Sequence, residues 1–360
     1  MITTTKKAIS DLVELKNELP EGEKSLFERF FNVASTVGRL APPASMEGWI
    51  NKSFGSVARV KEQRIVKVTN QLTLEGSLFN ELRASRPMEC QIGQEIRQVI
   101  ENSSGDPFCK PEEGTPADSF GRKKGIHCQT ASNIAKYDGY HGVVIFAEHN
   151  PLAFSREAIA DYFKTGFQWA EAAHREDPQS NYYFFMWNCL WKSGASIIHG
   201  HAQTTLTRGM HYPKVEYLRR VAVAYRQKYG ANYFDDLYKV HQSLDLAWEW
   251  DGGVKGLAYL TPIKEKEILL WADQPGEPLY HAVHAVLAKL AGLCVTSFNL
   301  VLYVPPLNET GEDWFQFPAL IRIVDRGDPN NKTADFGAME LYAASVISSD
   351  PFRVAEVIKS

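Results

Sequence analysis

The sequence predicts an α+β fold in which helices pack on an antiparallel sheet, in two similar halves that follow an N-terminal helical extension. Two observations support this prediction. From residue 141 onward, patterns typical of strand, helix, strand and strand follow one another, which is an α+β order. A similar series recurs after residue 254 in a degenerate form. We therefore expect an extension over residues 1–57, a first domain over 58–235 and a second, degenerate domain over 236–360.

The composition is typical of an ordinary globular protein. The chain has 360 residues, 44% of them apolar, and a formal net charge of −4. This charge gives no reason to expect nucleic acid or an acidic membrane as a partner. The N-terminal stretch has no apolar run of the length that a signal peptide or a membrane span requires, and the five cysteines are scattered. We therefore expect a cytoplasmic protein without a disulfide framework.

The N-terminal part reads as helices followed by a strand and a loop. Residues 8–19 and 23–36 have helical patterns, and a breaker cluster follows in "APPASMEG". Residues 57–70 alternate in the manner of a strand. Residues 101–125 are rich in glycine, proline and charge, so we expect a long surface loop there.

The two similar series supply the sheet and its helices. In the first series we expect strands at 141–149, 182–188 and 197–206, with an amphipathic helix at 155–176. In the second series we expect strands within 254–271, a helix at 277–293, and strands at 298–306 and 314–325.

The stretch "SGASIIHGHAQTTL" places His199, His201 and Gln203 at every second position. Side chains alternate between the faces of a strand, so these three are expected on one face. A neutral imidazole can attack phosphorus, and two imidazoles can also bind a metal. The spacing alone does not choose between these roles, or between them and two structural histidines.

The surroundings of the two histidines favour a site for an anionic group. Gly194 and Ser196 belong to a stretch of small residues, which allows backbone N–H groups to approach an anionic oxygen. Asn188 ends the preceding predicted strand, eleven positions before His199. We expect its side chain to reach the same pocket.

The pattern Asn188-x10-His199-x-His201-x-Gln203, with Gly194 and Ser196 inside it, resembles a known signature. It is similar to that of the galactose-1-phosphate uridylyltransferase branch of the histidine-triad superfamily. That branch also includes diadenosine tetraphosphate phosphorylases and ADP-glucose phosphorylases. The resemblance covers about residues 58 to 360 and is most specific in the first half.

The resemblance implies two tandem histidine-triad-like half-units and a role for each matching residue. His201 is the implied nucleophile, which takes a nucleoside monophosphate from a donor and passes it to a second substrate, with Ser196 and Gln203 beside it. Gln203 can donate a hydrogen bond to a phosphate but cannot shuttle a proton, which favours transfer over hydrolysis. The implied substrate-binding residues are Asn188, Gly194, Arg83, Arg86 and Asn133.

The resemblance also implies a zinc site and no organic cofactor. Its ligands are Asp106, Cys109, His149 and His199, where Asp106 stands in the place of a family cysteine. One thiolate, one carboxylate and two imidazoles form an acceptable tetrahedral set.

The second half departs from the uridylyltransferase pattern. Pro318-Ala319-Leu320 stands where those enzymes carry a metal-binding His-x-His, so no iron-type site is expected. Glu340 corresponds only with a one-residue offset to the family's acidic residue near the sugar. Arg122, Lys123 and Lys124 are read as a solvated charge run.

These features lead to one function and several alternatives. The expected activity transfers a nucleoside monophosphate from a UDP-hexose type of nucleotide sugar to a phosphate or a sugar phosphate, through a nucleotidyl-histidine. The alternatives within the family are a diadenosine tetraphosphate phosphorylase or ATP adenylyltransferase, an ADP- or GDP-sugar phosphorylase, and a nucleotide hydrolase. A metal-dependent hydrolase and a non-catalytic nucleotide binder are the alternatives outside it. The expected partners are a nucleotide sugar or dinucleoside polyphosphate, a phosphate-bearing acceptor and, as an option, a second copy of the chain.

Overall fold

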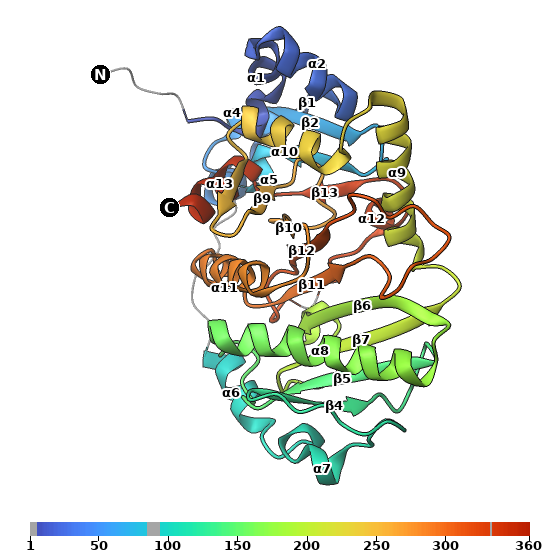
Figure 1. The fold of residues 1–360 in the computed structure, drawn as a ribbon. Coiled ribbons are helices and arrows are strands. Elements are labelled where there is room, and N and C mark those ends of the chain that lie inside the picture. Colours follow the sequence, from blue (N-terminus) through green and yellow to red (C-terminus); the bar gives the residue numbers. More distant parts are fainter. Residues whose placement is uncertain (1–5, 85–93, 332) are drawn as a thin grey trace.

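The computed structural model describes residues 6–84, 94–331 and 333–360 and has the predicted α+β architecture (Figure 1). A nine-stranded sheet forms its centre, and all of its pairings are antiparallel. Its strands, in spatial order, are β4 (Cys128–Ser132), β5 (Tyr140–Phe146), β7 (His201–Arg208), β6 (Ser180–Cys189), β11 (Phe298–Tyr303), β12 (Ala319–Asp325), β10 (Ile268–Ala272), β9 (Val254–Ala258) and β8 (Ala247–Trp250).

The sheet consists of two similar halves that meet where β6 pairs with β11. Outward from this pairing, the order β6, β7, β5, β4 on one side matches β11, β12, β10, β9 on the other. Each half carries one long helix between its corresponding strands, α8 (Arg156–Glu176) and α11 (Glu277–Gly292), and these helices contact each other on one face (Figure 1). This order confirms the predicted repeat of strand, helix, strand and strand. The domain boundaries at 57 and 235 stay predictions.

A second sheet of four strands lies toward the N-terminus of the chain. Its order is β1 (Phe31–Arg39), β2 (Glu62–Asn70), β3 (Gly76–Asn80) and β13 (Ser345–Ile347), with β13 parallel to β3. The prediction of a helix over 23–36 is therefore wrong for its second part. Helix α2 (Glu21–Phe30) ends at Phe30, and the chain then runs antiparallel to β2, because the β-branched residues at 33, 36 and 37 suit a paired strand.

The remaining helices surround the two sheets. They are α1 (Leu12–Glu18), α3 (Glu47–Phe54), α4 (Val57–Lys61), α5 (Glu81–Ala84), α6 (Gln94–Asn102), α7 (Pro111–Gly114), α9 (Pro213–Tyr229), α10 (Tyr233–Ser243), α12 (Ala338–Tyr342) and α13 (Pro351–Lys359). Within the described residues, no helix combines the length and the apolar character that a membrane crossing requires. The strand expected from residue 57 starts only at Glu62, after the turns of α4.

The stretch 101–125 is more ordered than the predicted loop. It contains the end of α6, the 3-10 turn η3 (Pro107–Cys109) and α7. The charge run is not fully solvated either. Arg122 is half-buried and donates to the backbone oxygens of Pro111, Thr115 and Thr130, so it holds this segment against β4. The guanidinium therefore has a structural role.

The core lies between the long helices and one face of the nine-stranded sheet. The ring of Phe146 stacks on Tyr162 of α8 with centroids 3.7 Å apart, and Phe163 of α8 stacks on Tyr280 of α11 at 4.6 Å. Along β6, Tyr183, Phe185 and Trp187 are buried on this helix side. The alternate residues Phe184, Met186 and Asn188 point to the opposite face and are only partly buried. That second face is the open face, and it carries the candidate site.

The cysteines differ from the expectation in one respect. Cys109, Cys128 and Cys189 have free thiols, whereas Cys294 is disulfide-bonded. The scattered spacing of the cysteines did not predict this bond.

Candidate active site

The strand that carries His201 begins at His201 itself, and His199 lies in a bend before it. The backbone N–H of Phe146 donates to the oxygen of Gly200 at 2.9 Å, and the N–H of Gly200 donates to the oxygen of His149 at 3.1 Å. A methyl group at position 200 would lie 2.7 Å from Phe146 Cδ2, so only glycine fits there. The predicted strand therefore begins only at His201, so it includes His201 and Gln203 and is wrong for His199. The rings of His199 and His201 both contact Phe108.

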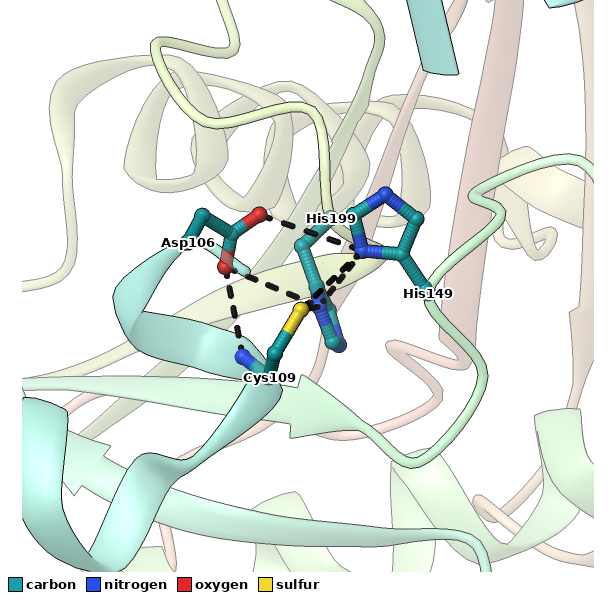
Figure 2. A group of neighbouring side chains, drawn as sticks. All are labelled: Asp106, Cys109, His149 and His199. Carbon is teal, nitrogen blue, oxygen red and sulfur yellow. Dashed lines mark hydrogen bonds and ion pairs between the residues drawn. The ribbon is translucent and has the colours of Figure 1, made fainter. Parts of the chain in front are cut away.

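The bend turns His199 toward three side chains from other segments (Figure 2). Its Nδ1 lies 3.1 Å from His149 Nδ1 and 3.5 Å from Cys109 Sγ, and that sulfur lies 3.4 Å from His149 Nδ1. Asp106 completes the group, with one oxygen 3.7 Å from His199 Nδ1 and the other 3.9 Å from His149 Nδ1. The structure thus brings together all four residues of the predicted metal site.

Local sequence explains how Asp106 and Cys109 reach this position. Asp106 caps the turn η3, where its Oδ1 accepts hydrogen bonds from the backbone N–H groups of Phe108 at 2.7 Å and Cys109 at 3.2 Å. Pro107 has its preferred place at the first position of the turn. Oδ2 of Asp106 is buried and has no hydrogen-bond partner among the described residues. This orphaned oxygen faces the group.

The tautomers of the two histidines show that the group suits a cation. Nε2 of His199 lies 2.8 Å from the oxygen of Phe146, and Nε2 of His149 lies 2.9 Å from the oxygen of Ile100. Carbonyl oxygens only accept, so both rings carry their N–H at Nε2 and direct the lone pair of Nδ1 inward. Burial also lowers the pKa of His199, which favours the neutral ring.

The spacing of these atoms fits zinc. A tetrahedral zinc ion holds two nitrogen ligands about 3.3 Å apart and a nitrogen and a sulfur ligand about 3.5 Å apart. The distances above, 3.1 Å between the Nδ1 atoms and 3.4 and 3.5 Å to the sulfur, are close to these values. The two nitrogens and the sulfur are thus spaced as zinc requires, and the Asp106 oxygens lie slightly further out, at 3.7 and 3.9 Å from the Nδ1 atoms. The four residues present fit a zinc ion.

His201 has the opposite tautomer to its neighbours. Its Nδ1 lies 2.8 Å from the oxygen of His199, so Nδ1 carries the hydrogen and Nε2 carries the lone pair. The ring is buried and has Phe108 against it in an edge contact, with centroids 5.2 Å apart. Burial lowers the pKa of His201, so the imidazole is neutral near pH 7. A neutral, oriented imidazole is a competent nucleophile.

Gln203 lies on the same face, two residues after His201. Its Oε1 lies 2.9 Å from Nε2 of His141 and accepts from the hydroxyl of Tyr137 at 3.3 Å. The carbonyl half of the amide is thus engaged, which leaves the NH₂ half available to donate. Asn133 belongs to the same group, because its Nδ2 lies 3.1 Å from His141 Nε2.

Asn188, Gly194 and Ser196 precede the bend, and Asn188 contacts β11. Asn188 lies next to the His201 strand on β6, and its Oδ1 accepts from Nδ2 of Asn299 at 2.6 Å. Gly194 has a left-handed backbone with φ of 100° at the end of the turn η4 (Trp191–Ser193). Ser196 is exposed and follows in the same loop.

Two predicted residues are not placed at this site. Arg83 is exposed on α5, which packs against β2 of the four-stranded sheet, and no contact of the described residues joins it to His201. Arg86 lies outside the described residues. Glu340 is half-buried and caps α12, where it accepts from the backbone N–H of Gly337 at 2.9 Å.

Sequence reasoning missed the partners that hold these side chains. His141 and Tyr137 orient Gln203, and Asn299 orients Asn188. The alternation of strand 140–146 could have placed His141 on the site face, because Val143 pairs with Gln203 across the strands. No sequence signal could have paired Asn188 with Asn299, which lies 111 residues away.

The fold is similar to those of several solved structures. An ADP-glucose phosphorylase from Arabidopsis thaliana, with bound ADP-glucose, superposes with a TM-score of 0.61 at 15% identity, over 81% of this chain and 97% of that chain. A GalT-like protein from the same plant gives a TM-score of 0.56 at 15% identity, over 71% and 92% of the two chains. A uridylyltransferase gives 0.56 at 15% identity, over 81% and 96%.

Sequence comparison adds no closer relative. No protein-family model matches the chain, and no curated protein matches it at a significant level. The structural likenesses agree with the resemblance that the motif around His201 predicts. The chain therefore shares the fold of the ADP-glucose phosphorylase, the GalT-like protein and the uridylyltransferase.

Proposed function

We propose that the chain is a nucleotidyltransferase that works through a covalent nucleotidyl-histidine at His201. The observation that carries this proposal is the hydrogen bond from His201 Nδ1 to the oxygen of His199, at 2.8 Å. It fixes the lone pair on Nε2 and leaves that atom as the attacking group. The fold similarity to an ADP-glucose phosphorylase and a uridylyltransferase supports the same reaction class.

The reaction has two displacement steps at one phosphorus atom. In the first, Nε2 of His201 forms a bond to the α-phosphorus of the donor, and the bond from that phosphorus to the leaving phosphate oxygen breaks. The imidazole then carries a positive charge, which the oxygen of His199 stabilises through Nδ1–H. In the second, an acceptor phosphate oxygen attacks the same phosphorus, the P–N bond breaks, and His201 returns to its neutral form.

The neighbouring side chains assist both steps by donating hydrogen bonds. The NH₂ group of Gln203 can donate to a phosphoryl oxygen because its own oxygen is held by His141 and Tyr137. In this proposal Ser196 and the backbone around Gly194 donate to the phosphates, and Asn188 and Asn133 contact the nucleotide. The described residues give no support for a role of Arg83 in this reaction, and Arg86 lies outside them.

We propose a nucleotide sugar as the donor and a phosphate or a sugar phosphate as the acceptor. The bound ADP-glucose in the similar phosphorylase structure supports a nucleotide sugar and leaves the base open. We also propose that zinc binds between Asp106, Cys109, His149 and His199. A bound zinc ion would fix the position of His199, whose oxygen orients His201.

Labelling with a radioactive donor tests the proposal. A nucleotide sugar labelled at the α-phosphorus should label the wild type to one equivalent and then stop in the absence of an acceptor. His201→Gln should give no labelled protein, because an amide cannot form the P–N bond. His174→Gln is the matched control and should label normally, because His174 lies in the last turn of α8 and contacts the oxygen of Ser180 at the start of β6. Undiminished labelling of folded His201→Gln would reject the proposal.

The main alternative within the family is a hydrolase that releases the monophosphate to water. The same experiment separates it from the transferase, because a hydrolase turns over without an acceptor. The oriented amide of Gln203 favours the transferase, since it offers no group that could take a proton from water.

A further inference from the structure

A cavity lies on the open face of the sheet, over β11 and β12. It has a volume of about 480 Å³ and is closed on its other sides by the turn after β2 and by α9. Its floor is polar and its walls are largely apolar. The floor residues are Arg322, Glu75 and Glu267, and the wall residues include Phe184, Val301 and Tyr303.

The floor is a buried group of charged side chains with one unmet donor. Nε of Arg322 donates to Glu267 at 2.7 Å, and its Nη1 donates to Glu75 at 2.8 Å. The side chain of Glu267 is fully buried and that of Arg322 is 12% exposed. Nη2 of Arg322 is buried and has no hydrogen-bond partner among the described residues. Such a donor is costly to leave unpaired, which points to an acceptor on a ligand.

The floor lies in line with the candidate active site. Gln203 is opposite Met186, Met186 is opposite Val301, and Val301 is opposite Arg322. These residues share one face, and three strand spacings separate Gln203 from Arg322, or about 14 Å between their Cα atoms.

A second cavity of about 450 Å³ fills the space between them. It is lined by Tyr137 and Met186, near Gln203, and it shares Phe184, Tyr303 and Lys214 with the Arg322 cavity. The two cavities together form a path from Gln203 to Arg322. A substrate that is attacked at His201 can extend along this path.

The chemistry of the floor selects a neutral, hydroxylated group. Two carboxylates and one guanidinium have a formal charge of −1 together, which disfavours a phosphate against them. A hydroxyl group can accept from Nη2 of Arg322 and donate to a carboxylate oxygen at once. The rings of Phe184 and Tyr303 offer apolar faces for the C–H groups of a sugar ring. Lys214, exposed and shared by both cavities, is placed for the phosphate next to that sugar.

We propose that the Arg322 cavity binds the sugar ring of a hexose phosphate, which is the leaving group of the nucleotide sugar in one direction and the acceptor in the other. The link to catalysis rests on the proposed function, whereas the binding site itself does not. Glu75 and Arg322 are then specificity-determining residues for the sugar.

Direct binding of glucose 1-phosphate and galactose 1-phosphate, measured by calorimetry, tests this proposal. Glu75→Gln removes a floor carboxylate, and Val301→Trp fills the middle of the path. Each should raise the Kd of at least one hexose phosphate tenfold or more, with little change in the Kd of inorganic phosphate. Glu249→Gln, an exposed glutamate on β8, is the matched control and should bind like the wild type. Thermal unfolding checks that each variant is folded.

The outcomes separate this proposal from the proposed function. Wild-type protein that binds neither hexose phosphate would overturn the sugar site, as would folded Glu75→Gln and Val301→Trp variants with wild-type affinities. The absence of a nucleotidyl adduct on wild-type protein would reject the function alone. Selective loss of hexose phosphate binding in the two variants would still support the sugar site in that case.

Discussion

His201 and His199 are two residues apart, yet opposite ring nitrogens are free in them. In His201 the backbone oxygen of His199 holds Nδ1–H and leaves Nε2 free. In His199 the backbone oxygen of Phe146 holds Nε2–H and leaves Nδ1 free, toward His149 and Cys109. The arrangement matches the two proposed roles, attack on a substrate by His201 and binding of a cation by His199.

Replacement of Gln203 by histidine tests the role of the amide. An imidazole at this position can take a proton from water, so we expect Gln203→His to raise the ratio of hydrolysis to transfer at least several-fold. The measurement is release of nucleoside monophosphate from a nucleotide sugar, with and without an acceptor.

Thr207→His is the control for that experiment. Position 207 is on the same strand and the same face, four residues further along, and is partly exposed. An unchanged ratio in Gln203→His, or an equal rise in both variants, would contradict the role assigned to the amide.

At the scale of elements, the short turn η3 and the bend before β7 together build the group of side chains proposed to bind zinc. The motif Asp106-Pro107-Phe108-Cys109 caps its own turn and so fixes Cys109. Gly200 permits the close approach to Phe146 that turns His199 out of the strand. Alternation along 197–206 predicted a regular strand over the whole stretch. The prediction is wrong for its first part, where Gly200 makes backbone hydrogen bonds to Phe146 and His149 that a sequence pattern does not reveal.

Removal of the thiol in this turn should remove the metal. We expect wild-type protein purified with zinc present to contain about one equivalent, and Cys109→Ser to lose most of it, because a serine oxygen is a much weaker zinc ligand than a thiolate. Elemental mass spectrometry gives the zinc content.

Cys128→Ser is the matched variant, since Cys128 is a free thiol on β4 outside the group of four. It should retain zinc. Equal zinc in wild type and Cys109→Ser, or no zinc in either, would refute the assignment of the site.

At the scale of the whole molecule, buried neutral histidines link stability to pH. Burial lowers the pKa of His241 to about 4. Its Nδ1 lies 2.8 Å from the oxygen of Leu237, and its Nε2 accepts from the N–H of Leu260, which is the pattern of a neutral ring. The unfolded chain takes up this proton near pH 6.5, so it binds more protons than the folded chain between pH 6.5 and 4. Stability therefore falls as the pH drops through this window.

The expected loss from His241 alone is about 2 kcal/mol between pH 7.5 and pH 5. Urea unfolding at these two pH values measures it, by comparing the wild type with His241→Gln. The variant is less stable at both values because it loses packing, but the difference between its two values should be smaller by about that amount. The same pH dependence in both proteins would show that His241 does not titrate on unfolding.

The sequence predicts the elements of this molecule better than it predicts their neighbours. The helices α8 and α11 and the strands around them follow from periodicity, which the structure confirms. Alternation shows which residues share a face, but not which strands pair. The contact of β6 with β11 and the pairing of Arg322 with Glu75, 247 residues apart, are consequences of tertiary packing.

The same limit applies to the site. The motif itself identifies His201 and Gln203, and the resemblance identifies the four residues that the structure brings together around His199. Arg83 stays a prediction, and its helix packs against the four-stranded sheet. The partners of the motif, His141, Tyr137 and Asn299, come from strands and a loop whose positions depend on the assembled sheet.

Intact mass measurement of the wild-type protein after incubation with nucleotide donors tests the central claim most directly. The panel contains UDP-glucose, ADP-glucose, a GDP-hexose and diadenosine tetraphosphate, each without an acceptor. We predict that one donor adds the mass of a single nucleoside monophosphate, that peptide mapping places it on His201, and that an acceptor phosphate removes it. An adduct on another residue, or no adduct with any donor while the nucleotide is consumed, would contradict a covalent nucleotidyl-histidine.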